Sequence, residues 1–223
     1  MRVVHLTDVH VGPTTPRRFL GEVADVASSL EPDLVVLTGD YVNASLVHLE
    51  RITELVRALP RPCIATLGNH DHWTDARRVS KALERGGAHV LRNESLSIDA
   101  LSVVGVDDGR SGHADVERAF ARVTRPEEAL VLTHFPRTAE EIARAGAPLV
   151  LSGHTHAGQL HFPRVTEAVA RLVGHRYLHG FYRVGPRTDL YVNAGLGHAA
   201  LRAGRARPEL AVFDLGPSMS HPS

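Results

Sequence analysis

Five short polar clusters, each directly after a run of strand-forming apolar residues, constrain the fold of this 223-residue chain more than any other feature. The apolar runs cover residues 3–6, 34–37, 63–67, 129–132 and 149–151. The polar clusters that follow them are Asp8-Val9-His10, Gly39-Asp40, Gly68-Asn69-His70-Asp71, Thr133-His134 and Gly153-His154-Thr155-His156. Because ligands of open α/β sheets bind beyond the carboxyl ends of the strands, these polar side chains are predicted to meet at one place.

The alternative is that the clusters are unrelated capping and turn residues. A single Asp-x-His or His-x-His pair would be weak evidence, because such pairs are frequent by chance. Here the polar residues recur five times at the same position of a strand-loop-helix rhythm. The repetition favours one shared site over five separate local roles.

The rest of the sequence predicts an α/β fold. Apolar residues recur at helical spacing over 16–30, 45–59, 74–85, 115–123 and 138–145. Further strands are predicted over 88–91, 95–98, 101–106, 190–193 and 210–215. The three strands between 88 and 106 have no helix between them, so we expect them to pair as an antiparallel meander. The stretch 157–188 is rich in Gly, His, Arg and Pro, and we expect substrate contacts there.

Length and composition indicate one globular domain. Hydrophobic residues make up 43% and charged residues 22% of the chain. These values are typical of globular proteins and suggest neither a disordered nor a membrane protein. We expect a single domain over 1–216 and a disordered tail over 217–223. The formal net charge of +0 argues against a general electrostatic hold on nucleic acid.

Cys63 is the only cysteine, so no intrachain disulfide can form, and its place in an apolar strand predicts a buried, inert thiol. The first strand starts directly after Met1, without a signal peptide, and no apolar stretch approaches the length needed to cross a bilayer. These features predict a cytoplasmic protein.

The clusters offer carboxylate, imidazole and amide ligands without a thiolate. This set suits Mn, Fe, Zn, Co or Ni rather than a soft-metal or iron-sulfur centre. A shared carboxylate is the simplest way to hold two cations about 3.5 to 4 Å apart, and Asp40 is the candidate bridge. The sequence therefore predicts two divalent metal ions, with Mn as the first choice for an assay.

The order D-x-H, G-D, G-N-H-D, H and G-H-x-H, from Asp8 to His156, resembles the motif set of the calcineurin-like metallophosphoesterases. This resemblance implies a four-layer α/β/β/α sandwich of two mixed β-sheets flanked by helices. It also implies two sets of metal ligands that share one residue. The first set is Asp8, His10, Asp40 and His156, and the second is Asp40, Asn69, His134 and His154.

The resemblance further implies a hydrolase in which a metal-bridging hydroxide attacks a phosphodiester or pyrophosphate bond of a small or nucleotide-linked substrate. His70 would act as the general acid that protonates the leaving oxygen. Asp71 would either orient the His70 ring or cap a helix.

The segment from Ser152 to Gln159, followed by Gly195-Leu196-Gly197 and Pro208-Glu209-Leu210, resembles the branch that includes membrane-linked UDP-2,3-diacylglucosamine pyrophosphatase-like enzymes. The chain departs from this branch at Ala157, where glycine is usual. Residues 164–173 carry an apolar stripe with two arginines, and a helix packed on the domain is favoured there over a lipid-facing lid.

Three other functions are alternatives: a phosphomonoesterase, a nuclease and a non-catalytic metal-binding scaffold. The neutral charge and the lack of an aromatic-basic ladder oppose a nuclease. A scaffold would lack ligands or the acid, whereas every such position is filled here. We expect a small-molecule phosphoester or pyrophosphate partner, membrane contact is not favoured, and the sequence indicates no protein partner.

The remaining histidines divide into two groups. Structural or solvated roles are expected for His5, His48, His89, His113 and His221. Proximity to the motif loops makes substrate contact an open alternative for His72, His161, His175, His179 and His198. A turn is the favoured interpretation of Asp107-Asp108, and Gly195 and Gly197 would permit close backbone approach to a ligand.

Overall fold

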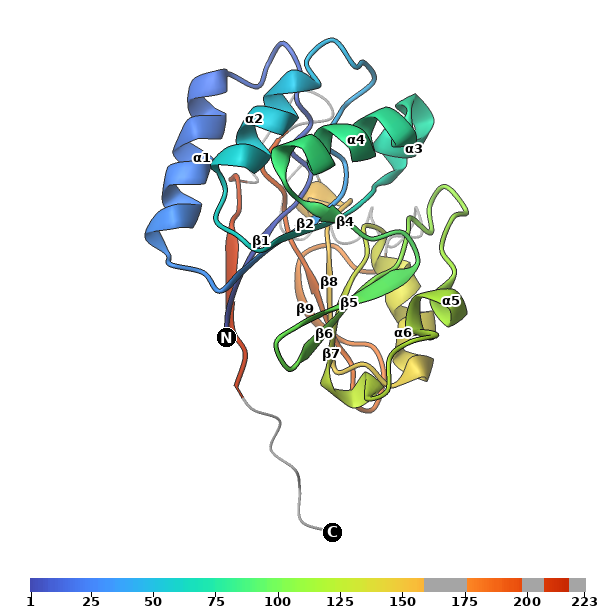
Figure 1. Ribbon diagram of the computed structural model, residues 1–223. Coiled ribbons are helices and arrows are strands. Elements are labelled where there is room, and N and C mark those ends of the chain that lie inside the picture. Colours follow the sequence, from blue (N-terminus) through green and yellow to red (C-terminus); the bar gives the residue numbers. More distant parts are fainter. Residues whose placement is uncertain (159–175, 198–206, 217–223) are drawn as a thin grey trace.

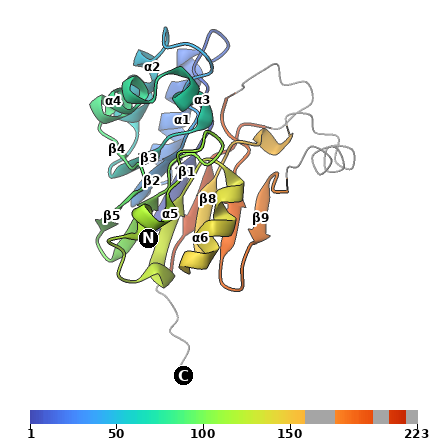
Figure 2. The same ribbon diagram turned by 90° about the vertical axis from the view of Figure 1, so that its right-hand side faces the viewer.

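The computed structural model describes residues 1–158, 176–197 and 207–216. Two β-sheets pack face to face, and helices cover the outer face of each (Figures 1 and 2). The strand orders are β11-β1-β2-β3-β4 in one sheet and β5-β6-β7-β8-β10-β9 in the other. The predicted four-layer α/β/β/α class is confirmed.

The first sheet consists of three central parallel strands with a short parallel strand at one edge and an antiparallel strand at the other. Its strands are β1 (Arg2–Leu6), β2 (Leu34–Thr38), β3 (Cys63–Thr66), β4 (His89–Val90) and β11 (Ala211–Asp214). The helices on its outer side are α1 (Arg17–Ser29), α2 (Glu50–Ala58) and α4 (Ala76–Gly86), and α3 (Asn69–Thr74) directly follows β3. All five residues of β2 are buried, as its unbroken apolar run predicts for a strand covered on both faces.

The second sheet has four parallel strands between two antiparallel edge strands. Its strands are β5 (Glu94–Ile98), β6 (Leu101–Gly105), β7 (Ala129–Leu132), β8 (Leu149–Ser152), β9 (Gly180–Arg183) and β10 (Asp189–Val192). The accompanying helices are α5 (Val116–Phe120), α6 (Ala139–Ala145) and the short 3₁₀ turns η1 (Pro126–Glu128), η2 (Pro136–Thr138) and η3 (His156–Gly158).

The core between the two sheets follows from the alternation of side chains along each strand. In β1, Val3 belongs to the cluster between the sheets, whereas Val4 packs in the cluster that α1 and α2 cover. Val36 and Leu130 face the same inter-sheet layer from opposite sheets. Each fully buried Val or Leu of this layer contributes roughly 1.5–3 kcal/mol, so the two sheets are held together mainly by apolar burial.

The predicted antiparallel meander over 88–106 is wrong. Residues 89–90 form β4, which pairs parallel with β3 in the first sheet, and only β5 and β6 form an antiparallel hairpin in the second. The reason is that α4 precedes β4, so β3, α4 and β4 form a crossover unit that returns in the parallel sense. The chain then passes between sheets at Asn93, which adopts a left-handed backbone with φ 56.

Three further predictions have different outcomes. The stretch 157–188, in which no strand was predicted, contains β9, whose four residues form too short a run to be recognised from alternation. Cys63 is fully buried, and burial raises the pKa of its thiol to about 12, which confirms an inert cysteine. The amphipathic helix of 164–173 and the tail of 217–223 lie outside the described residues.

Across the described part of the chain, no helix combines the length and the apolar character needed to cross a bilayer. The cytoplasmic location and the extent of the single domain stay predictions.

Candidate metal centre

The loops after β1, β2, β7 and β8 bring six predicted ligands into two clusters. One is Asp8, His10 and His156, and the other is Asp40, His134 and His154. Within each cluster the donor atoms all lie within 4.8 Å of one another. The predicted convergence of distant strand ends is therefore present, although the assignment of single residues to single metals stays a prediction.

Asp40 belongs to the second cluster and also approaches the first. Its Oδ2 atom is 3.1 Å from His134 Nε2 in one cluster and 3.6 Å from His10 Nε2 in the other. Its Oδ1 atom accepts a hydrogen bond from the backbone N–H of His70 at 2.9 Å. This is the position that a bridging carboxylate requires.

The donor set fits cations. Asp8 Oδ1 and Asn69 Oδ1 are buried without a hydrogen-bond partner, and a buried oxygen of this kind is destabilising unless a positive group satisfies it. His10 Nε2 and His156 Nε2 lie only 3.0 Å apart, and each is also close to Asp8 Oδ1. Imidazole and carboxylate atoms gathered in this way suit first-row divalent metals.

The electrostatics of the site lead to the same conclusion. Burial alone would raise the pKa of Asp8, but the neighbouring His156 and His10 hold it well below its usual range. Burial lowers the pKa of His134, whereas the charge of Asp40 and a hydrogen bond that His134 donates to it raise that pKa to about 10. The buried carboxylates thus stabilise positive charge beside them, and they would stabilise metal cations in the same way.

Neighbouring polar groups orient the ligands. His134 Nδ1 donates to the carbonyl oxygen of Thr38 at 2.7 Å, so Nε2 is the ring atom that faces the site. Asp8 Oδ2 accepts from the Thr7 hydroxyl at 2.8 Å and from the backbone N–H of His154 at 3.0 Å, so Oδ1 remains for a cation. Each of these ligands thus presents one defined atom.

Five predicted ligands have left-handed backbone angles, which are unusual for residues other than glycine. They are Asp8 (φ 52), His10 (φ 45), Asp40 (φ 55), His154 (φ 76) and His156 (φ 49). Strain of this kind collects at functional sites when the surrounding structure imposes it. Ala157, at which the sequence departs from the branch that it resembles, shares this conformation with φ 50.

Two motif glycines are required by contact with the ligands. A Cβ atom on Gly68 would lie 2.3 Å from Asp40 Oδ1, and one on Gly153 would lie 2.2 Å from Asp8 Oδ2. The glycines of G-N-H-D and G-H-x-H therefore let the backbone approach the carboxylates directly.

His70, the predicted acid, lies beside the clusters without belonging to either. Its ring meets that of His10 edge-on at 4.9 Å between ring centres. Its Nδ1 atom lies 2.5 Å from the carbonyl oxygen of Asn43 and must donate to it, so Nε2 is the atom that can serve a substrate. Asn43 was not predicted, because a backbone carbonyl leaves no signal in the sequence.

Of the two roles predicted for Asp71, the structure shows the capping of a helix. Its carboxylate accepts hydrogen bonds from the backbone N–H groups of Gly68, Asp40, Tyr41 and Val42 at 2.8–3.3 Å. The ring of His70 is oriented by Asn43 instead, so the predicted Asp71–His70 contact is corrected. Burial and the charge of Asp40 raise the pKa of Asp71 to about 8, while the bonds from Gly68 and Val42 oppose this shift.

The loop of residues 193–197 braces Asp8 from the other side. Gly197 N donates to Asp8 O at 2.7 Å, and a Cβ atom on Gly195 (φ +81) would lie 2.7 Å from that of Asp8. Glu209 holds this loop through the backbone N–H of Ala194 at 2.9 Å. The close approach expected at these glycines is thus to a predicted ligand.

Other candidate contacts have structural partners. His179 and Tyr191 bond the carboxylate of Glu209. Partial burial acts to raise the pKa of Glu209, but these hydrogen bonds lower it to about 2. His72 bonds Asp107 at 2.7 Å, and Asp108 accepts from Ser111 in the predicted turn. The positions His161, His175 and His198 lie outside the described residues.

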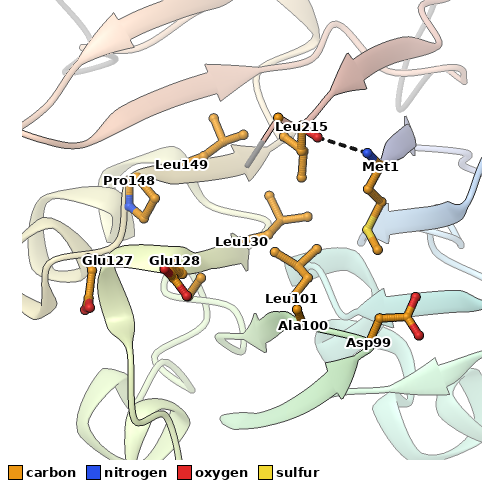
Figure 3. Close-up of a pocket in the computed structure, with 12 residues that line it drawn as sticks. Met1, Asp99, Ala100, Leu101, Glu127, Glu128, Leu130, Pro148, Leu149 and Leu215 are labelled. Atoms are coloured by element: carbon orange, nitrogen blue, oxygen red, sulfur yellow. Dashed lines mark hydrogen bonds between the residues drawn. The ribbon is translucent and has the colours of Figure 1, made fainter. Parts of the chain in front are cut away.

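A cavity of about 690 Å³ lies at the opposite ends of the strands (Figure 3). Leu101, Leu130 and Leu149 line it near the starts of β6, β7 and β8, together with Met1 and Leu215. No histidine lines this cavity, and it is separated from the metal ligands by the length of the strands. It is therefore not the site that the motifs predict.

The comparisons with known proteins agree with this geometry. The sequence profile of the family described as calcineurin-like phosphoesterase matches residues 1–158. A zebrafish (Danio rerio) transmembrane protein with a metallophosphoesterase domain is 34% identical over 89% of this chain and 49% of its own length. The chain spans about half the length of several of the curated relatives it matches.

Two other matches concern characterised activities. The UDP-2,3-diacylglucosamine pyrophosphatase LpxG of Chlamydia trachomatis is 27% identical over 72% of this chain and 64% of its own length. A solved archaeal phosphodiesterase, 17% identical, covers 96% of this chain and 93% of its own with a TM-score of 0.55, which shows a shared fold. The predicted resemblance is confirmed, and the chain belongs to the calcineurin-like phosphoesterase family, a family of metal-dependent phosphoester hydrolases.

Proposed function

We propose that this chain hydrolyses phosphodiester or pyrophosphate bonds of a small or nucleotide-linked substrate with two divalent cations. The observation that carries the proposal is the position of Asp40, which belongs to one cluster of metal-binding side chains and lies 3.6 Å from His10 of the other, with His70 beside them. The 27% identity to a pyrophosphatase supports the choice of bond. A phosphomonoesterase or a nuclease is the alternative.

The predicted ligands would hold the cations in two sets, Asp8, His10, Asp40 and His156, and Asp40, Asn69, His134 and His154. When bound, the cations would lower the pKa of a bound water molecule to near neutrality. They would also neutralise charge on the phosphoryl oxygens.

His70 would then deliver a proton to the leaving oxygen. Because Nδ1 donates to Asn43 O, Nε2 is the atom from which the proton would be transferred. Asp71 fixes the turn that carries Asp40 and the start of α3, so it acts on the reaction by positioning these residues.

The first test is metal analysis of protein purified without chelator, followed by hydrolysis of bis-p-nitrophenyl phosphate with added Mn. We expect close to two metal ions per chain, and activity that Asp40→Ala abolishes. Asp25→Ala, at an exposed carboxylate on α1, is the matched control and should keep both. A parent protein that binds metals but cleaves no diester, monoester or pyrophosphate would favour the non-catalytic scaffold.

The second test addresses His70. We expect His70→Ala to keep its metals while turnover of substrates with poor leaving groups falls by roughly 10²–10⁴. Substrates that release p-nitrophenolate need less protonation and should lose less. His89→Ala, at an exposed histidine of β4, serves as control, and equal loss of metals and activity in His70→Ala would contradict the assignment.

A further inference from the structure

Trp73 is a large apolar side chain at the surface beside the proposed acid. It is 61% exposed, although tryptophan is on average highly buried. Single exposed apolar residues are common, so exposure alone indicates no site. What distinguishes Trp73 is its neighbour, because its ring centre lies 5.2 Å from that of His70.

The local fold fixes this pairing. His70 and Trp73 are three residues apart in α3, a spacing that places two side chains on the same side of a helix. The turn is secured by Thr74, whose hydroxyl donates to the carbonyl oxygen of His70 at 2.8 Å. The His70 ring therefore contacts His10 of the metal centre and the exposed Trp73 at the same time.

Phe181 is as exposed as Trp73 but does not lie beside a predicted site residue. It is 63% exposed, and its ring contacts are with Tyr191 and Phe213 on the strands of the sheets. Among the exposed large apolar residues that the structure describes, Trp73 is the one in ring contact with a predicted site residue.

We propose that Trp73 binds the leaving group of the substrate by stacking, and that this group carries a flat aromatic or heteroaromatic ring. The inference rests on the proposed function, in which His70 protonates the leaving oxygen. A group bonded to that oxygen must lie next to His70, where the exposed face of Trp73 is available. Nucleobases and aryl groups share the flat π-system that stacks on tryptophan, whereas a saturated group stacks poorly.

The first test uses fluorescence, because Trp73 is the only tryptophan of the chain. Protein loaded with Zn is mixed with AMP, phenyl phosphate or ribose 5-phosphate, and quenching of Trp73 by acrylamide is measured. We expect AMP or phenyl phosphate to shield Trp73, and ribose 5-phosphate, which has a phosphate but no flat ring, to leave it accessible. Shielding by AMP alone identifies a nucleobase, and shielding by phenyl phosphate alone an aryl group. Equal effects of all three compounds overturn the proposal.

The second test compares two phosphodiesters whose leaving alcohols have similar basicity, 2-naphthylmethanol and cyclohexylmethanol. Trp73→Ala should raise KM for the naphthyl ester about 5- to 50-fold more than for the cyclohexyl ester, the effect expected of one stacked ring. Trp73→Phe should recover most of the loss. Phe181→Ala is the control matched in exposure and should leave both KM values unchanged.

The two proposals fail in different ways. If the parent cleaves no ester at all, the proposed hydrolysis is wrong and the fluorescence experiment alone decides on Trp73. If the parent cleaves both esters and Trp73→Ala changes their KM values equally, the stacking role is wrong while the hydrolase stands.

Discussion

At the scale of single residues, the site combines carboxylates that need a positive partner with neighbours that fix their orientation. Asp8, Asp40 and Asp71 are all buried, yet their oxygens meet different groups. One oxygen of Asp8 and one of Asp40 lie against imidazoles, whereas both oxygens of Asp71 accept backbone N–H groups. The same residue type thus serves as a predicted ligand in two cases and as a backbone anchor in the third.

Asp71→Asn tests the anchor role. The amide of Asn would place an N–H donor against backbone N–H groups, and we expect the free energy of unfolding to fall by roughly 2–4 kcal/mol. Urea unfolding of the variant and the parent at pH 9, where the carboxylate of Asp71 is ionised, measures this loss. Asp75→Asn is the control, because Asp75 caps α4 with a single bond to Arg78 N and Asn caps nearly as well. Unchanged stability with a reduced kcat would restore the alternative in which Asp71 orients His70.

His5 makes stability depend on pH. It is fully buried, and burial lowers the pKa of its ring to about 4 from an ordinary 6.5. Because the unfolded chain takes up this proton at higher pH than the folded chain, stability is lost as the pH falls from 6.5 towards 4. When the pH falls from 7.5 to 5, the free energy of unfolding of His5→Leu should decrease by about 2 kcal/mol less than that of the parent. Urea titrations at both pH values measure this difference, and equal losses would show that His5 is not the titrating group.

At the scale of elements, the centre depends on loops whose backbones pack so closely that a Cβ atom would not fit between them. The loop of residues 193–197, held by Glu209, packs against the turn of Asp8 at the end of β1. These segments come from opposite ends of the chain and from different sheets. Their contact couples the second sheet to a ligand presented by the first.

Gly195→Ala tests this contact. The new Cβ would lie 2.7 Å from Asp8 Cβ, so we expect a loss of metal affinity of at least tenfold, measured by metal titration. Gly146→Ala is the control, because Gly146 has a similar left-handed φ of +91 but open space around its Cβ position. Both variants carry the backbone strain of a left-handed alanine, about 1–2 kcal/mol, but only Gly195→Ala should lower the affinity for metal ions. Equal metal affinity in the two would contradict the bracing role.

At the scale of the whole molecule, bound cations should stabilise the fold, because they would join buried oxygens that follow strands of the first sheet to imidazoles that follow strands of the second. A ligand present at 100 to 1,000 times its Kd stabilises by about 3–4 kcal/mol. We therefore expect EDTA to lower Tm and added Mn to restore it. Asp40→Ala should remove this dependence, whereas Asp25→Ala should keep it. A Tm that is insensitive to chelator would argue against a metal centre that joins the two sheets.

The sequence by itself determined the α/β class, most strands and helices, and the set of predicted ligands, because each of these depends on local patterns. Apolar runs followed by Asp8, Asp40 or His134 are visible without knowledge of the fold. The tertiary structure alone decided the partner of β4, the contact of Asn43 with His70 and the bracing of Asp8 by Gly195. These features arise between segments far apart in the chain, through backbone atoms and pairing choices that side-chain identity does not encode.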